Sequence, residues 1–204
     1  MEPNRSVESK RSITGEFKLQ ITTLLGLVAL LWAIEIVDQV VFRGNLDRLG
    51  IRPRSLSGLW GILWAPFLHG NFVHLLANTV PLVSLGWLIM LRETGDWLVV
   101  SVIAALCSGL GTWLIGAPSS LHIGASGVVF GYFGFLLLRG YFERSAVAIA
   151  FSVLVTFLYG GIIWGVLPSQ PGISWEGHLF GFLGGILAAR LLAKPRRQPQ
   201  PKDF

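Results

Sequence analysis

The sequence predicts an all-α membrane protein: a bundle of six transmembrane helices with a long first loop in the membrane interface. Of its 204 residues, 52% are hydrophobic and only 13% are charged, whereas soluble proteins carry about 25% charged residues. The apolar residues come in long blocks, and the charges are confined to the edges of those blocks. This pattern is typical of a membrane protein and not of a soluble domain with alternating polar faces.

Six apolar blocks follow one another along the chain. Because backbone polar groups without partners are costly in lipid, blocks of this length are expected to be helices. We expect a single membrane domain over residues 19–192, between a cytoplasmic N-terminal segment (residues 1–18) and a disordered cytoplasmic tail (residues 193–204). The six blocks are Leu19–Phe42, Asn71–Leu91, Trp97–Ile115, Ser126–Leu138, Ala146–Gly165 and Gly177–Leu192.

The connection between the first two blocks, residues 43–70, is much longer than the others. It contains the large apolar side chains Trp60, Leu63, Trp64 and Phe67. Long loops are usually functional, and aromatic residues favour the membrane interface, so we expect this loop to lie there.

The Lys and Arg residues predict the orientation of the chain. Twelve of the 16 lie in the N-terminal segment, in the joints after the second and fourth blocks, at the end of the sixth block (Arg190) and in the tail. By the positive-inside rule, both termini are expected in the cytoplasm. The same rule accounts for the formal net charge of +5, so no nucleic-acid partner is needed to explain it.

The first apolar block is expected to stay in the protein as a membrane span. It is too long for the core of a signal peptide and has no evident cleavage site. A short chain with no targeting segment favours a multi-pass protein of a bacterial plasma membrane. The lipid bilayer is then an obligatory partner of the chain.

The fourth block is short for a membrane span. The distance from Ser126 to Arg139 is thirteen residues, or about 20 Å of helix, against about 30 Å for the hydrocarbon core. If Arg139 marks the cytoplasmic boundary, Ser126 lies about 10 Å below the outer surface by the same measure. The preceding residues 116–125 must then dip into the membrane, which requires a water-accessible pocket or burial in protein.

Three further polar residues fall in the same layer as Ser126. Counted from Arg190, His178 lies about 18 Å above the cytoplasmic boundary; counted from Arg92, Asn78 and His74 lie about 21 and 27 Å above it. Polar residues at this depth are expensive unless they are paired or functional. We therefore expect these residues, which lie on three different helices, to form one site.

The residue types at this site suit nucleophilic catalysis. Ser126 opens a helix, where free backbone N–H groups and the helix dipole favour negative charge. A serine hydroxyl needs a neighbouring base, and His178 can supply it because histidine titrates near neutral pH. Small residues at GxxxG spacing would let the two helices approach closely; they are Gly127 and Gly131 in the fourth block and Gly181 and Gly185 in the sixth.

An oxyanion formed on attack would need hydrogen-bond donors. The Ser126 backbone N–H, the Asn78 amide and the His74 imidazole can supply them. His74 and Asn78 are four residues apart, so they lie on one face of their helix.

Three motifs give the sequence a resemblance to the rhomboid family of intramembrane serine proteases. They are HGNFVHLLAN (residues 69–78) in the second block, GASG (residues 124–127) at the start of the fourth, and HLFGFLGG (residues 178–185) in the sixth. The resemblance covers about residues 60–190. It implies a six-helix fold, a Ser126–His178 dyad without an acid, and an oxyanion hole of His74, Asn78 and the Ser126 amide.

The resemblance also implies the substrates. They would be transmembrane segments of other membrane proteins, cut near their outer ends at small residues. No cofactor or metal is expected, since the sequence contains no HExxH motif, no paired Asp motif and no Cys–His set that would indicate a metalloprotease or an aspartyl protease.

Two positions depart from the family pattern. Many members have Trp-Arg in the first loop, whereas here Trp60 is followed by Gly61. Many also have a tyrosine four residues after the nucleophile, stacked under the catalytic histidine, whereas here the residue is Phe130. Neither change removes a reacting group.

Several other polar residues have open roles. His122, four residues before Ser126, is a rival base. His69 is expected to be structural, and Glu35 and Asp38 to bond to neighbouring helices or to the first loop. Cys107 is expected to pack in the bundle.

Two alternative functions also remain open. The first is a catalytically silent relative that binds transmembrane segments, although the loss of Ser126 or His178 that would mark it is absent. The second is a small transporter using Glu35, Asp38 and the histidines, which would predict inverted repeats and a midplane site that the sequence does not show.

Overall fold

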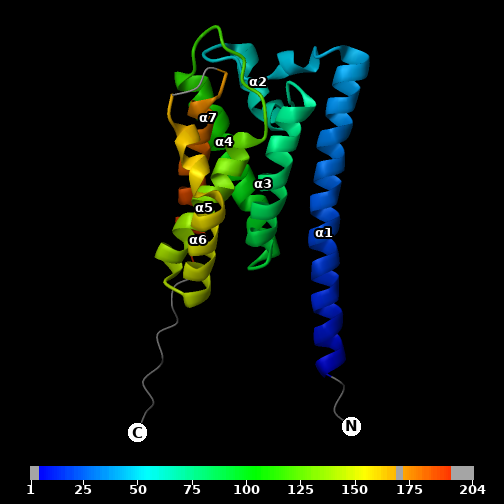
Figure 1. Cartoon of the computed structure of the whole chain (residues 1–204), viewed down its shortest axis with the longest axis vertical. Helices are drawn as coiled ribbons and strands as arrows, with labels where there is room; N and C mark the ends of the chain where they lie inside the picture. Colours follow the sequence, from blue (N-terminus) through cyan, green and yellow to red (C-terminus); the bar gives the residue numbers. More distant parts are fainter. Residues whose placement is uncertain (1–4, 169–171, 194–204) are drawn as a thin grey trace.

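The computed structural model describes residues 5–168 and 172–193. Within them the chain is a helical bundle without a β-strand, and α1 lies to one side of the other helices (Figure 1). The first-loop helices are grouped at one end of the bundle, which we call the loop end (Figure 1). In chain order the elements are α1 (Arg5–Val37), η1 (Asp38–Phe42), η2 (Leu46–Leu49), α2 (Leu56–Trp64), η3 (Ala65–Phe67), α3 (Phe72–Met90), α4 (Thr94–Ile115), α5 (Ser126–Glu143), α6 (Ala146–Tyr159), η4 (Gly160–Val166) and α7 (Trp175–Leu191).

Four helical stretches in this part of the chain are long and apolar enough to cross a membrane: Ile13–Phe42, Phe72–Met90, Thr94–Ile115 and Ala146–Val166. They also leave large apolar side chains uncovered, since Val73 is 78% exposed and Phe157 is 86% exposed. A surface of this kind would be costly in water and is favourable in hydrocarbon.

The first loop, residues 43–71, contains its own short helix. Ser55 caps α2 by accepting a hydrogen bond from the backbone N–H of Gly58 at 3.1 Å. The side chains of Trp60, Leu63 and Trp64 are exposed on this helix. The interfacial position of the loop stays a prediction, and these side chains are the ones that would contact lipid.

Helices α5 and α7 pack at the centre of the bundle through glycines. A Cβ atom added to Gly181 would overlap the carbonyl of Gly127, and one added to Gly185 would overlap the carbonyl of Gly131. The two backbones therefore touch directly, as the GxxxG spacing predicts.

The end of α5 differs from the sequence prediction. The helix does not stop before Arg139 but runs on to Glu143, and Arg139 is only 4% exposed. The predicted end of this helical block at Leu138 was therefore wrong, and the membrane depth counted from Arg139 stays a prediction. A single arginine after an apolar block looks like a helix end, but here partners from elsewhere in the chain neutralise it.

The partners of Arg139 form a buried ion-pair cluster at the end opposite the first loop. Its guanidinium lies 2.9 Å from Asp96 at the start of α4 and 2.6 Å from Glu143. Arg92, in the joint between α3 and α4, also pairs with Glu143 at 2.7 Å. The cluster ties the α3–α4 joint to the end of α5.

We predict that Arg139→Leu destabilises the fold strongly. It would leave the carboxylates of Asp96 and Glu143 buried with reduced compensation, which typically costs about 3–5 kcal/mol. Arg92→Ala is the matched control, because its side chain is partly exposed and Glu143 would keep Arg139. A loss below about 1 kcal/mol is expected for it. Thermal unfolding in detergent micelles measures the stability of both variants. Equal losses of stability would contradict the conclusion that Arg139 is the centre of the ion-pair cluster.

At the loop end, the carboxyl groups of Glu35, Asp38 and Asp47 approach one another. Asp38 accepts a hydrogen bond from the backbone N–H of Leu46 at 2.9 Å, and Glu35 accepts one from Gln39 at 3.0 Å. The expectation that these two residues bond to the first loop or to a neighbouring helix is confirmed for Asp38. Glu35 bonds instead to the next turn of its own chain. Burial, followed by the charges of Asp38 and Glu35, raises the pKa of Asp47 to about 6.

This raised pKa gives a pH-dependent prediction for Asp47→Asn. The pKa in the folded chain is above the ordinary value of 3.8, so the stabilisation from a neutral Asp47 is fully present below 3.8 and is lost as the pH rises through about 6. Because asparagine cannot ionise, we expect Asp47→Asn to unfold at a higher temperature than the wild type at about pH 8, with no difference at about pH 4. Glu16→Gln, at an exposed position, is the control, and a pH-independent effect of Asp47→Asn would contradict the assignment.

Candidate active site

Ser126 and His178 meet across the α5–α7 contact. Ser126 is the first residue of α5, and His178 lies in the first turn of α7. The Ser126 Oγ atom lies 2.8 Å from the His178 Nε2 atom. His178 is buried. The structure therefore brings together the two residues that the sequence singled out.

The second nitrogen of His178 fixes which atom carries the proton. Nδ1 lies 2.9 Å from the carbonyl oxygen of Gly165 in η4. A carbonyl can only accept, so Nδ1 carries the hydrogen and donates it. In the neutral ring Nε2 is then free to accept, and the Ser126 hydroxyl donates to it. A backbone carbonyl thus orients the imidazole as a carboxylate would.

Phe130 packs flat against His178. The two ring centroids lie 4.1 Å apart and the ring planes differ by 7°. The stacking expected of a tyrosine at this position therefore survives without the hydroxyl. Gly165 makes this arrangement possible, since a Cβ atom there would lie 2.7 Å from the Phe130 ring and 3.2 Å from His178 Nδ1.

His74 and Asn78 lie beside the turn that precedes Ser126. Gly124 has a φ of +113°, which disfavours any other residue. A Cβ atom there would lie 2.8 Å from His74 Nε2 and 3.7 Å from Asn78 Nδ2. The Asn78 amide donates to the backbone carbonyl of His74 at 3.1 Å, which leaves its second N–H available.

His69 supports the backbone next to the serine. It is fully buried, and its Nε2 atom accepts from the backbone N–H of Ala125 at 3.4 Å. Burial lowers the pKa of His69 to about 4; the neighbouring His74 adds to this and a backbone hydrogen bond at Phe67 opposes it. The ring is therefore neutral at physiological pH, as acceptance from Ala125 requires. The expectation that His69 is structural agrees with this contact.

His122 is not placed to act as the base for Ser126. Its Nε2 atom lies 2.6 Å from the Ser120 hydroxyl and its Nδ1 atom lies 2.6 Å from the Ser174 hydroxyl. Both ring nitrogens are thus engaged elsewhere. The hypothesis that His122 is a rival base was therefore wrong.

Close packing explains why glycine stands at position 61. A Cβ atom there would overlap the carbonyl of Gly50 and would lie 2.6 Å from the backbone nitrogen of Ile51. No arginine fits at this position when the first loop folds back in this way. Trp60, the preceding residue, is exposed.

A small cavity of about 30 Å³ borders Ser126. A cavity of this size can hold a water molecule when polar groups line it. The residues that line it include Ser108 and Thr112 of α4 and Ser174, together with Ser126 and His122. Sequence analysis did not identify Ser108, Thr112 or the Gly165 carbonyl, because their positions beside the site depend on which segments meet.

Cys107 lies at a half-buried position on α4. A Cβ atom added to Gly184 of α7 would meet its side chain, which fits a packing role. Among residues 5–168 and 172–193, no group of three or more His, Cys, Asp or Glu side chains could hold a metal ion.

Comparison with known proteins places these features in a family. The family model of the rhomboid domain matches residues 56–195. The chain is 45% identical over 185 residues to an uncharacterized protein of Mycobacterium tuberculosis, covering 87% of this chain and 77% of that protein. It is 43% identical over 184 residues to an uncharacterized protein of Mycobacterium leprae, covering 86% of this chain and 72% of that protein.

A third relative, YdcA of Bacillus subtilis, carries a name that assigns it provisionally to the rhomboid proteases. It is 27% identical over 184 residues, which cover 87% of this chain and 90% of that protein. The matched region contains all of the helices from α2 to α7, and with them Ser126 and His178. The chain is therefore an integral membrane protein that belongs to the rhomboid family.

Proposed function

We propose that this chain is an intramembrane serine endopeptidase that cleaves transmembrane segments of other membrane proteins, with Ser126 as nucleophile and His178 as general base. The observation that carries the proposal is the hydrogen bond of 2.8 Å between the Ser126 hydroxyl and His178 Nε2. The bond from His178 Nδ1 to the Gly165 carbonyl supports it, because it leaves Nε2 as the acceptor that a general base requires.

In the proposed reaction the Ser126 Oγ atom attacks the scissile carbonyl carbon while its proton passes to His178 Nε2. The charge on the resulting imidazolium is favoured by the Gly165 carbonyl, to which Nδ1 already donates. The tetrahedral intermediate collapses when the peptide C–N bond breaks, and His178 gives the proton to the leaving amine. The acyl group then remains on Ser126.

The negative oxygen of the tetrahedral intermediate needs donors. The backbone N–H of Ser126 stands at the first position of α5, where it has no partner within the helix. The Asn78 amide and the His74 imidazole lie against Gly124, two residues earlier in the chain. The turn at Gly124 thus opens the space in which these three donors could converge.

The second half of the reaction consumes water. The residues that line the cavity of about 30 Å³ beside Ser126 include Ser108, Thr112 and Ser174, so polar groups are present that could bind a water molecule there. Deprotonated by His178, this water would attack the acyl carbon, and the return of the proton to Ser126 would release the product acid.

The same proposal includes the membrane arrangement. Helices α5 and α7 would complete a set of six spans, since they pack inside the bundle formed by the four long apolar helices. The basic residues predict cytoplasmic termini. The bacterial relatives favour a plasma membrane, and the substrates would be membrane proteins in that same bilayer.

We predict that Ser126→Ala and His178→Ala each abolish cleavage of a fluorogenic transmembrane peptide by the purified protein in detergent or proteoliposomes. The first variant removes the nucleophile and the second removes its base. A fluorophosphonate probe should label the wild type at Ser126, and labelling should fall strongly in His178→Ala.

Ser84→Ala is a matched control, because the Ser84 hydroxyl on α3 bonds to Tyr159 of α6 and to the Val80 carbonyl instead of to either residue of the pair. Cleavage that persists in Ser126→Ala would falsify the nucleophile assignment. Equal labelling of the wild type and His178→Ala would exclude His178 as the base.

We also predict that Asn78→Ala lowers kcat by about 10²–10³-fold, the range for loss of one oxyanion donor. The substrate KM should change little, because the donor acts on the charge of the transition state. Thr79→Ala, next to it on α3, is the control, since Thr79 bonds to Leu75 and Trp32 instead. If Asn78→Ala lowers kcat by less than about threefold, Asn78 has a packing role only.

A further inference from the structure

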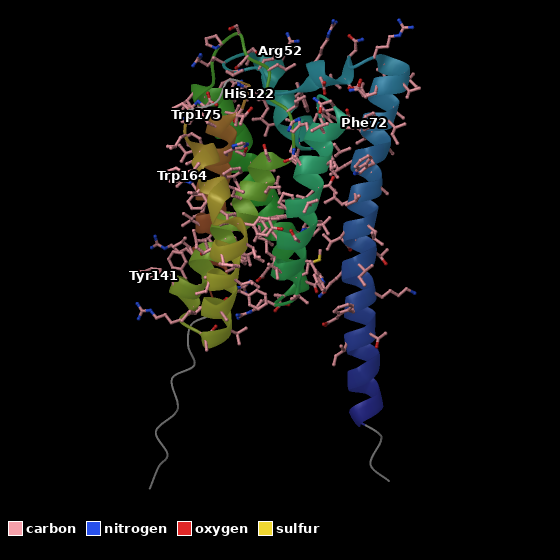
Figure 2. All side chains as sticks on the ribbon, viewed as in Figure 1. Arg52, Phe72, His122, Tyr141, Trp164 and Trp175 are labelled. Atoms are coloured by element: carbon pink, nitrogen blue, oxygen red, sulfur yellow. The ribbon has the colours of Figure 1, made fainter. Side chains whose placement is uncertain are left out.

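Two serine–histidine pairs connect the same two segments of the chain. Ser126 of α5 bonds to His178 of α7. His122, four residues before Ser126, bonds to Ser174, four residues before His178. The second pair thus lies next to the first with the residue types exchanged. Figure 2 shows His122 near Trp175, the residue that follows Ser174, at the same end of the bundle as Arg52.

The hydrogen bonds of Ser120 fix the direction of the second pair. The Ser120 hydroxyl donates to the carbonyl of Ala117 at 2.6 Å, so its oxygen can only accept from His122 Nε2. In the neutral ring His122 Nδ1 is then an acceptor, and the Ser174 hydroxyl donates to it at 2.6 Å. Burial lowers the pKa of His122 while the carboxylate of Glu176 opposes the shift, and the neutral ring is the form that can accept.

The backbone of His122 is held independently of its side chain. Its N–H donates to the carbonyl of Ile51 at 3.0 Å, and its carbonyl accepts from the Ile51 N–H at 2.9 Å. Two residues later the Gly124 N–H donates to the carbonyl of Ala65 at 2.8 Å. The first loop therefore fixes the strip of backbone that leads to Ser126.

Ser174 is attached just as directly to His178. Its carbonyl accepts the backbone N–H of His178 at 3.1 Å. A side-chain bond to Ser174 therefore holds the turn of α7 that carries the imidazole. The hydrogen bond between His122 and Ser174 therefore joins the segment before Ser126 to α7 by a route separate from the Ser126–His178 bond itself.

We propose that the His122–Ser174 hydrogen bond is a positioning tie that holds His178 in register with Ser126 for the cleavage reaction. This inference rests on the proposed function. His122 and Ser174 are positioning residues in it and do not touch substrate. The glycine contacts between α5 and α7 set how close the helices come, but glycines have no side chains to prevent a small slide or rotation. The tie supplies that restraint one turn from the reacting atoms.

The variant that tests the tie is Ser174→Ala, which removes only the hydroxyl. We expect kcat to fall about 10- to 100-fold with KM unchanged, since displacement of a reacting group by about 1 Å costs up to that much. Ser174→Thr keeps a hydroxyl and should restore most of kcat. His122→Asn keeps an acceptor oxygen near the position of Nδ1 and should lose less than His122→Phe.

Ser120→Ala is the matched control. It removes the other serine bonded to His122, at the same distance, but it leaves the tie in place, because the Ser174 hydroxyl can donate to or accept from Nδ1 in either tautomer of the ring. Its kcat should stay within about threefold of the wild type, well short of the loss expected from misplacement. Unfolding temperatures are measured for every variant, and only those that fold like the wild type are compared.

Fluorophosphonate labelling of Ser126 provides a second measurement that does not depend on binding a transmembrane substrate. A slower labelling rate in Ser174→Ala, restored in Ser174→Thr, supports the tie. If the wild type cleaves and Ser174→Ala cleaves equally fast, or loses no more than Ser120→Ala, the tie is overturned. If Ser126 is labelled in a Ser174-dependent way but the wild type cleaves no peptide, the proposed function fails and the tie stands.

Discussion

The direct contact of the α5 and α7 backbones is the constraint on which the rest of the site depends. Gly127 and Gly131 of one helix lie against Gly181 and Gly185 of the other so closely that no Cβ atom fits between them. This contact fixes the start of α5 against the start of α7, and Ser126 and His178 bond directly across it at 2.8 Å.

The first loop supports the backbone that precedes Ser126. The residues before Ser126 are irregular, and the polar groups of an irregular backbone need hydrogen-bond partners when protein buries them. Here Ile51 bonds to both backbone groups of His122, and Ala65 accepts from Gly124. Gly61, which departs from the family pattern, lets the loop fold back on the Gly50–Ile51 backbone. The loop is thus part of the support of the serine turn.

The contact between Ser126 and His178 could be predicted from sequence because polar residues stand out in apolar helices and because glycine spacing reveals close packing. The same reasoning misplaced the end of α5, since the partners of Arg139 come from Asp96, far away in the chain, and from Glu143, which reads as part of a joint. It could not find the carbonyl of Gly165, because a backbone acceptor has no sequence signature. It also took His122 as a rival base, since its partner Ser174 is identified only when the two segments meet.

The two serine–histidine pairs show why a short hydrogen bond alone does not define a nucleophile. His178 donates from Nδ1 to Gly165 and accepts at Nε2, whereas His122 donates from Nε2 and accepts at Nδ1. Each pair therefore has a serine that donates to a neutral imidazole. Their surroundings differ in what they would do to a negative oxygen. Ser126 begins α5 beside the donors of His74 and Asn78, while Ser174 precedes a helix turn that carries the buried carboxyl of Glu176. Donors stabilise an oxyanion and a carboxylate opposes it, and for this reason the proposed reaction uses Ser126 as the nucleophile and Ser174 as a positioning residue.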